Sequence, residues 1–180
     1  MRFKQNVVCL WVLALSLCCG ELWAQEMVDR AAVKSGQAPF FHGIASGDPL
    51  PDAVILWTRI TPSSGAMDSI PVQWMISTDP QFSQIANFGS ALALADEDFT
   101  VKVDVCGLQP ATYYYYLFHA EGRNSVTGRT KTAPLGSVSN LKFGVASCSN
   151  LPNGYFNAYA DMADRHNDMD AWLHLGDYIY

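Results

Sequence analysis

Two residues with metal-binding side chains each follow a short apolar run in the last part of the chain. Cys148 comes shortly after the run 141–146, and Asp177 comes shortly after the run 171–175. A thiolate and a carboxylate can both bind metal ions. Each residue also has an ordinary structural explanation, because a single cysteine is often a buried thiol and an aspartate can cap a turn. The residues therefore offer a candidate metal site and leave the structural alternative open.

The elements that must position these two residues follow a β–α–β pattern. The runs 141–146 and 171–175 are rich in strand-forming residues, and 155–165 between them has apolar residues at helical spacing. Strands joined by a right-handed crossover run parallel, so their carboxyl ends meet at one edge of the sheet, where ligands bind. We therefore expect Cys148 and Asp177 to reach one metal ion. Because two parallel strands cannot bury both faces, 141–180 is expected to begin a larger α/β domain that the chain truncates.

Residues 40–133 show a different pattern. Short alternating runs separated by Gly, Pro and Asp predict an antiparallel β-sandwich of the immunoglobulin or fibronectin III type. The predicted strands are 53–60, 72–77, 99–105, 112–120 and 129–132. Within 99–105, Phe99 and the three valines are expected to face inward. The segments on either side of the sandwich, 25–39 and 134–140, are predicted to be linkers.

The motif from Leu108 to Tyr114, Leu-x-Pro-x-Thr-x-Tyr, leads directly into one of these strands. It resembles the E–F corner of fibronectin type III modules. A tyrosine hydroxyl at such a corner can bond back to the chain and pin the crossover between sheets. The alternative is a tyrosine-rich strand without a corner, but Gly107 and Pro110 supply the turn that a corner needs.

The first 24 residues are predicted to be a secretory signal peptide. A positively charged start precedes the apolar run 7–20, which is short for a membrane span, and Ala24 is a suitable last residue before cleavage. An uncleaved anchor, or lipid attachment at Cys18 or Cys19, are the alternatives. The chain has no Arg-Arg pair, so twin-arginine export is not supported. We expect an exported protein, periplasmic or extracellular, without a stable membrane span after cleavage.

Composition and cysteine content narrow the possible partners. The net charge is −6, and no cluster of Lys and Arg indicates nucleic-acid binding. Composition does not indicate an oligomeric state. Only Cys106 and Cys148 remain after cleavage of the signal. They could pair in an oxidising compartment, but a disulfide would be incompatible with Cys148 as a metal ligand. Cys106 follows an inward-facing strand and is expected to be buried and inert.

Three stretches of the chain resemble the alkaline phosphatase D (PhoD-like) family. The stretch 41–59 (FHGIASGDPLPDAVILWTR) is similar to the opening of that family's N-terminal domain. The stretches 143–163 and 173–180, which contain Ala-Ser-Cys and Gly-Asp-Tyr-Ile-Tyr, are similar to the first blocks of its catalytic domain. The resemblance implies a metallophosphoesterase-like fold for that domain, with iron(III) and calcium as cofactors and phosphate esters as substrates.

The resemblance also implies roles for individual residues. Cys148 matches the family's iron-binding cysteine, Asp177 its metal-bridging aspartate and Tyr180 its iron-binding tyrosine. Thiolate and phenolate suit trivalent iron, and a carboxylate can bridge to calcium. Asn150 and His174 are candidates to support these ligands. The family's later metal ligands have no counterpart in the chain, so its catalytic residues are expected downstream and the chain alone is expected to be inactive.

Three alternatives stay open. A purple acid phosphatase also has a Gly-Asp-x-x-Tyr motif beside a fibronectin-like domain, but it places an aspartate where this chain has Cys148. Phosphodiesterase or phospholipase D activity within the same family is a second alternative. The third is a β-sandwich binding module with a vestigial tail. A vestigial tail need not keep Cys148, Asp177 and Tyr180 together, which favours the truncated phosphatase.

Overall fold

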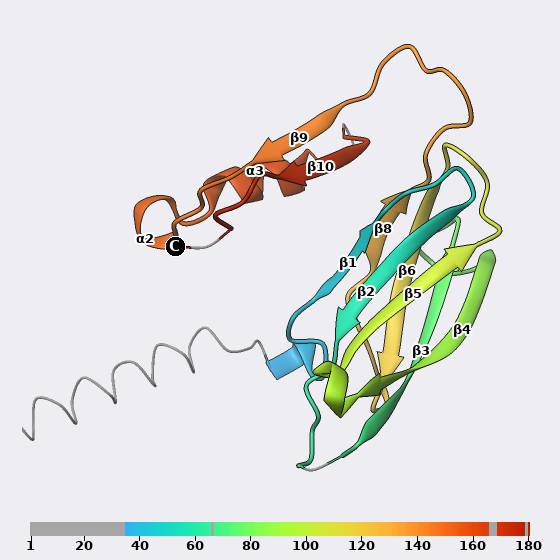
Figure 1. Ribbon diagram of the computed structural model, residues 1–180, viewed down its shortest axis with the longest axis vertical. Helices are drawn as coiled ribbons and strands as arrows, with labels where there is room; N and C mark the ends of the chain where they lie inside the picture. The colour runs from blue at the N-terminus through green and yellow to red at the C-terminus, as the bar shows by residue number, and fades with distance from the viewer. Residues whose placement is uncertain (1–34, 66, 166–168, 179) are drawn as a thin grey trace, which may run out of the picture.

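The computed structural model describes residues 35–65, 67–165, 169–178 and 180. The predicted signal peptide and residues 25–34 of the first predicted linker lie outside the described residues. The described chain has two parts, a pair of antiparallel sheets and a smaller unit with two parallel strands and short helices (Figure 1). No helix within the described ranges is long and apolar enough to cross a membrane.

The two antiparallel sheets enclose the main hydrophobic core. One sheet has the order β1 (Ile44–Gly47), β2 (Ala53–Arg59), β5 (Thr100–Cys106). The other has the order β4 (Ile85–Leu94), β3 (Ser69–Ser77), β6 (Tyr113–Ala120), β7 (Arg123–Asn124), and β8 (Gly128–Lys131) also pairs with β6. Both sheets contribute side chains to one buried cluster, which includes Val54, Leu56, Val72, Trp74, Ile76, Val101, Val105, Tyr114 and Phe118. The prediction of a sandwich-like pair of sheets is confirmed, and the five predicted strands correspond to β2, β3, β5, β6 and β8.

Strands β1, β4 and β7 were not predicted from the sequence. Strand β4 is rich in Ala, Gly and Ser, which have weak strand propensity, and it forms because it pairs with β3 along its whole length. Its small residues have a packing reason. The indole of Trp74 lies over Gly89, where an added Cβ would come within 2.7 Å of the ring. The strand therefore could not be recognised from its local composition, because tertiary packing determines it.

The tyrosine corner is present. The Tyr114 side chain is buried, and its hydroxyl accepts a hydrogen bond from the Gln109 backbone N–H at 2.8 Å. The buried Thr132 hydroxyl donates to the Gln109 carbonyl at 2.6 Å and accepts from the Thr112 N–H at 3.0 Å. These bonds satisfy the backbone groups of the crossover and join the start of β6 to the residue after β8.

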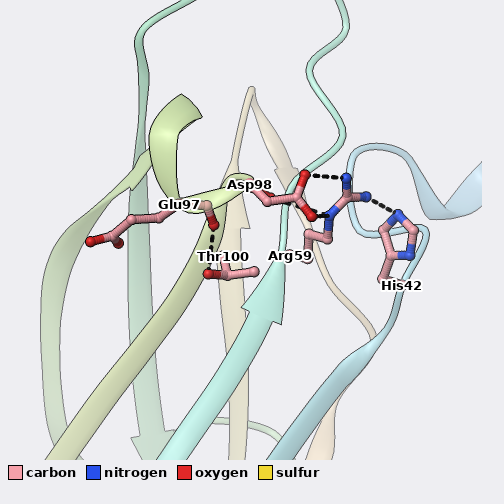
Figure 2. Close-up of polar contacts among 5 residues, drawn as sticks. All are labelled: His42, Arg59, Glu97, Asp98 and Thr100. Atoms are coloured by element: carbon pink, nitrogen blue, oxygen red, sulfur yellow. Dashed lines mark hydrogen bonds and ion pairs between the residues drawn. The ribbon is translucent and has the colours of Figure 1, made fainter.

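A charged contact joins the end of β2 to the turn before β5 (Figure 2). Arg59 donates to the Asp98 carboxylate through Nη2 at 2.7 Å and Nε at 3.0 Å, and its Nη1 contacts the His42 ring. The guanidinium lowers the pKa of the Asp98 carboxyl. Asp98 and Phe99 both have left-handed φ angles, 55° and 53°. Strand β5 therefore starts at Thr100, one residue later than predicted.

Cys106 is exposed, so the prediction of a buried thiol is wrong. Residues alternate along β5, and Val101 and Val105 face the core, which places Cys106 on the outer face. Its thiol lies 3.6 Å from an Asp104 carboxylate oxygen. Desolvation, followed by the charge of Asp104, raises the pKa of the Cys106 thiol. A raised pKa keeps the thiol protonated and unreactive. Cys106 and Cys148 are both free thiols.

The described end of the first predicted linker packs on the sandwich. It contains the 3-10 turn η1 (Ser35–Gln37) and the buried Pro39, whose carbonyl accepts a hydrogen bond from the Thr61 N–H at 2.9 Å. The second predicted linker, 134–140, contains neither helix nor strand. An apolar proline and one backbone bond are enough to hold a segment whose composition is otherwise polar.

The second part of the chain contains β9 (Phe143–Ala146), α2 (Leu151–Gly154), α3 (Asn157–Asp164) and β10 (Ala171–His174). Strands β9 and β10 pair in parallel from Phe143↔Ala171 to Ala146↔His174, as the sequence predicts. One face of this pair is covered. A Cβ added at Gly144 would come within 2.5 Å of Met169 Sδ and 2.6 Å of Met162 Cε, so a larger residue there would require these methionine side chains to shift away from β9.

The other face of the parallel pair is uncovered in the described chain. Phe143, Val145 and Leu173 lie on this face, and their exposed fractions are 52%, 58% and 50%. Burying a side chain of this size contributes roughly 1.5–3 kcal/mol. This sheet face therefore has exposed apolar side chains against which further structure could pack.

An ion pair connects the two parts. Lys131, the last residue of β8, lies 2.5 Å from an Asp170 carboxylate oxygen and also lies over the Tyr113 ring. The other Asp170 oxygen accepts a hydrogen bond from the Lys142 backbone N–H at 2.9 Å. Asp170 directly precedes β10, so this contact holds the start of the parallel pair against the edge of the sandwich.

We expect Tyr114→Phe to lower the free energy of unfolding by about 0.5–1.5 kcal/mol, because it removes the hydroxyl of a buried side chain that accepts the hydrogen bond from the Gln109 N–H. Urea unfolding followed by tryptophan fluorescence measures the change. Tyr115→Phe, one residue along the same strand, is the matched control and is expected to have a smaller effect. Equal effects of the two changes would contradict the role of the corner hydroxyl.

We expect Lys131→Met to raise the pKa of the Asp170 carboxyl. The hydrogen bond from Lys131 is the largest cause of the lowered pKa of Asp170, followed by the bond from the Lys142 N–H. Because the folded pKa is lowered, the contact stabilises the chain above the ordinary aspartate pKa and is lost as pH falls through the lowered value. The amide shift of Lys142, followed by NMR against pH, reports this titration.

Lys102→Met, on the outer face of β5, is the control and should leave the Lys142 titration unchanged. A midpoint that does not move in Lys131→Met would show that the ion pair does not form in solution.

Candidate functional site

The carboxyl ends of β9 and β10 lie side by side. The last register pair is Ala146↔His174, and the Leu175 N–H continues the pairing by donating to the Ala146 carbonyl at 2.9 Å. The chain therefore leaves both strands at the same edge of the sheet. The segments that follow carry the residues predicted to bind metal.

Backbone hydrogen bonds then join the two segments. The Cys148 N–H donates to the Gly176 carbonyl at 3.3 Å, and the Ser149 N–H donates to the Asp177 carbonyl at 3.1 Å. In the opposite direction, the Tyr180 N–H donates to the Ser149 carbonyl at 3.1 Å. This ladder is what brings Cys148 and Asp177 together, and the Cys148 Sγ lies 3.7 Å from an Asp177 carboxylate oxygen.

Both predicted ligands have unusual backbone conformations. Cys148 and Asp177 have φ angles of 58° and 49°, in the left-handed region that most side chains avoid, and Gly176 has a φ of 109°. Such conformations cost of order 1–3 kcal/mol each and persist only where the surroundings hold them. Here the cross-segment backbone bonds hold them. The result is that thiol and carboxylate turn toward each other at an exposed edge.

Tyr180 completes the predicted set of three. Hydrogen bonding to Asp177, and next to Cys148, raises the pKa of the Tyr180 phenol to about 12. Its phenol group therefore lies near both other predicted ligands and is protonated at neutral pH. A metal ion would have to displace this proton to gain a phenolate ligand.

Asn150 has a side-chain oxygen that is buried and has no hydrogen-bond partner among the described residues. It directly precedes α2, but it makes no capping bond to that helix. Buried polar atoms are rarely left without a partner, so this oxygen is an acceptor that a missing group would satisfy. A thiol, a carboxylate, a phenol and an unsatisfied amide oxygen near one sheet edge form a donor set that fits a metal ion.

His174 lies at the end of β10, on the side of the helix. Its Nε2 lies 2.6 Å from the Tyr159 hydroxyl, and its Nδ1 accepts a hydrogen bond from the Gly176 N–H at 3.3 Å. The side chain therefore contacts the segment that carries Asp177 and not the thiol–carboxylate pair itself. Tyr159 lies within 155–165, the stretch predicted to be helical from its apolar spacing, and its polar contact was not predicted. No sequence signal distinguishes such a tyrosine from a core residue.

No group of three or more His, Cys, Asp or Glu side chains gathers anywhere in the described parts of the chain. The predicted site contains one cysteine and one aspartate of these types, and its third member is a tyrosine. Sequence and geometry thus identify a pair of strong donors with a phenol beside them. A pair of this kind binds metal weakly unless further ligands join it.

Comparison with known proteins identifies the relatives of both parts. The family model described as PhoD-like phosphatase, N-terminal domain, matches residues 24–134, and the model described as PhoD-like phosphatase matches 143–180. Alkaline phosphatase D of Bacillus subtilis (strain 168) is 40% identical over 158 residues, which is 84% of this chain and 27% of that protein. A solved structure described as "Structure of PhoD" matches with a TM-score of 0.74 and 38% identity over 83% of this chain and 30% of that chain.

The chain thus spans well under half the length of the relatives that it matches. The second family model covers Cys148, Asp177 and Tyr180, the residues whose backbone segments the structure joins. The two family models, the sequence identity to the Bacillus relative and the structural match together show that the chain belongs to the PhoD-like phosphatase family.

Proposed function

We propose that the chain is the amino-terminal part of an exported, metal-dependent phosphatase that hydrolyses phosphate esters. The observation that carries the proposal is the approach of Cys148 Sγ to within 3.7 Å of the Asp177 carboxylate, at the carboxyl ends of two parallel strands. Ligands of α/β sheets bind at this edge. The relative from Bacillus subtilis is named alkaline phosphatase D, which supports the reaction class.

Cys148 and Tyr180 would hold iron(III), and the Asp177 carboxylate would bridge from the iron to calcium. Anionic thiolate and phenolate ligands donate strongly to trivalent iron, and carboxylate oxygens suit calcium. When bound, the metals would orient the phosphate, neutralise its charge and activate water. The phenol of Tyr180 would give up its proton to become a phenolate ligand. The Asn150 oxygen, which has no partner among the described residues, lies in the segment between Cys148 and α2.

In this proposal the two parts of the chain have different tasks. The unit from 141 to 180 begins a metallophosphoesterase-like catalytic domain, and the sandwich from 40 to 133, of immunoglobulin or fibronectin III type, lies beside it. The ion pair between Lys131 and Asp170 supports a fixed placement of the sandwich relative to the catalytic edge. The predicted signal peptide, 1–24, would direct the protein to the periplasm or the cell exterior.

We also propose that the chain does not catalyse hydrolysis alone. Three donor side chains do not complete a site for two or three metals. The exposed face of β9 and β10, with Phe143, Val145 and Leu173, supports a need for further packing. Membership of the PhoD-like family argues against the purple acid phosphatase alternative, and the match of residues 143–180 argues against an isolated binding module. Hydrolysis of phosphodiesters remains the second candidate activity.

We expect iron(III) added to the purified, reduced chain to produce a thiolate charge-transfer band that Cys148→Ser abolishes. The reason is that Cys148 supplies the strongest donor at the paired strand ends. Absorbance titration at neutral pH measures the band. Cys106→Ser is the matched control, because Cys106 is also an exposed free thiol but lies on the sandwich.

A band that survives in Cys148→Ser, or that Cys106→Ser removes equally, would reject Cys148 as an iron ligand. The absence of any band in the unchanged chain would reject the view that these residues hold iron without further ligands.

We expect the chain alone to show no hydrolysis of 4-nitrophenyl phosphate and to gain activity when mixed with the remaining part of the catalytic domain of the Bacillus relative. The uncovered apolar face of β9 and β10 provides the surface for such association. Val145→Asp should abolish the gain, whereas Val126→Asp, at an exposed position on the sandwich, should not.

Running the same mixture with bis(4-nitrophenyl) phosphate separates the two candidate activities. A much faster rate on the diester would favour the phosphodiesterase alternative. Hydrolysis by the chain alone, lost in Cys148→Ser, would contradict the proposal that it needs a further part.

A further inference from the structure

Asp177 is held in place from the helix side by two side chains that the metal proposal does not use. Figure 1 shows α3 lying along β9 and β10, and Tyr159 of α3 meets His174 at the end of β10. The His174 ring is surrounded by aromatic rings. Its centroid lies 5.9 Å from the Tyr159 ring, 5.9 Å from the Trp172 ring and 5.1 Å from the Tyr178 ring.

Only one assignment of donors and acceptors is consistent with the hydrogen bonds around His174. The Gly176 backbone N–H can only donate, so Nδ1 accepts at 3.3 Å and carries no proton. The single proton of the neutral imidazole therefore lies on Nε2, where it is donated to the Tyr159 hydroxyl at 2.6 Å. The hydroxyl keeps its own hydrogen, which is directed to the Tyr178 carbonyl through a longer contact of 3.5 Å.

This chain of bonds brackets Asp177. His174 accepts a hydrogen bond from the N–H of Gly176, the residue before Asp177. Tyr159 donates to the carbonyl of Tyr178, the residue after Asp177. From the other side, the Ser149 N–H holds the Asp177 carbonyl itself. Asp177 has a left-handed φ of 49°, which an aspartate adopts only at a cost, so its conformation depends on these flanking bonds.

We propose that His174, fixed in the Nε2–H tautomer by Gly176 and Tyr159, is a positioning residue that holds Asp177 in the conformation required to bind metal. The proposal rests on the function proposed above in naming the metal, but its hydrogen bonds are made between groups of the chain itself. His174 acts through the backbone and Tyr159 acts through His174. Neither side chain touches the metal or the substrate.

The tautomer gives a test that needs no metal. In the chain labelled with nitrogen-15, long-range NMR correlations of the imidazole should show His174 with a protonated Nε2 and a bare Nδ1 at neutral pH. The Gly176 amide should be protected from hydrogen exchange. A protonated Nδ1, an even mixture of tautomers, or an unprotected Gly176 amide would overturn the proposal.

Two substitutions at His174 separate a positioning role from simple packing. The carboxamide oxygen of His174→Asn can take the place of Nδ1 as acceptor for the Gly176 N–H, whereas His174→Ala cannot. We expect protection of the Gly176 amide to be lost in His174→Ala and largely restored in His174→Asn. Equal loss in both variants, with the sandwich still folded, would overturn the proposal, since cavity formation alone would then explain the effect.

Tyr159→Phe keeps the ring and removes only the hydroxyl, so it retains the aromatic packing around His174. Loss of partners that orient a ligand typically weakens metal binding by about 10–100-fold. We expect a weakening of this size for iron(III) in Tyr159→Phe, measured by the same absorbance titration. Tyr155→Phe is the matched control, because Tyr155 precedes the same helix and is 77% exposed. Unchanged iron affinity in Tyr159→Phe would overturn the positioning role.

The two proposals fail in different ways. If the unchanged chain binds no iron(III) but His174 shows the expected tautomer and Gly176 the expected protection, the view that these residues hold iron without further ligands fails while the bracketing of Asp177 stands. If iron(III) binds and Tyr159→Phe and His174→Ala bind it equally well, the metal assignment stands and the positioning role fails.

Discussion

The parallel pairing of β9 with β10 is the constraint on which the candidate site depends. Two segments separated by a helix leave the sheet at one edge because their strands run in the same direction. The pairing then continues as backbone hydrogen bonds between residues 148–149 and 176–177. These bonds force Cys148 and Asp177 into left-handed conformations and turn a thiol and a carboxylate toward each other. If the register slipped by one residue, the two side chains would point to opposite faces.

The same pairing explains why the unit is only partly packed. Helix α3 and the methionines at 162 and 169 cover one face, where Gly144 permits the approach, and the opposite face keeps Phe143, Val145 and Leu173 exposed. Parallel sheets in α/β proteins are covered on both faces. The ion pair at Lys131 anchors this unit to a sandwich that has its own core. The candidate site thus belongs to a unit that is anchored to the sandwich and that has an exposed apolar sheet face on its other side.

Much of this arrangement could be predicted from the sequence. Alternating apolar residues located β2, β3, β5 and β6, the Pro-x-Thr-x-Tyr motif located the corner, and the β–α–β pattern placed Cys148 and Asp177 at one sheet edge. The features that the sequence did not predict correctly have physical explanations. Strand β4 contains several Ala, Gly and Ser residues with weak strand propensity, and one of them, Gly89, is required by the packing of the Trp74 ring. Cys106 lies one residue beyond the inward-facing Val105, and so on the outer face. The polar role of Tyr159 depends on a histidine fifteen residues away, which helical spacing does not reveal.

The side chains at the sheet edge are positioned by hydrogen bonds that come from the chain itself. A carboxylate and a thiol that approach each other would repel if both were ionised, so the edge depends on bonds that do not involve these charges. Those bonds are the backbone ladder to Ser149 on one side and the His174 and Tyr159 pair on the other. Their free energy offsets the cost of the left-handed backbone at Cys148 and Asp177. A cation would then gain its full attraction for the carboxylate without a further cost of ordering the loop, which is the advantage of a preorganised site.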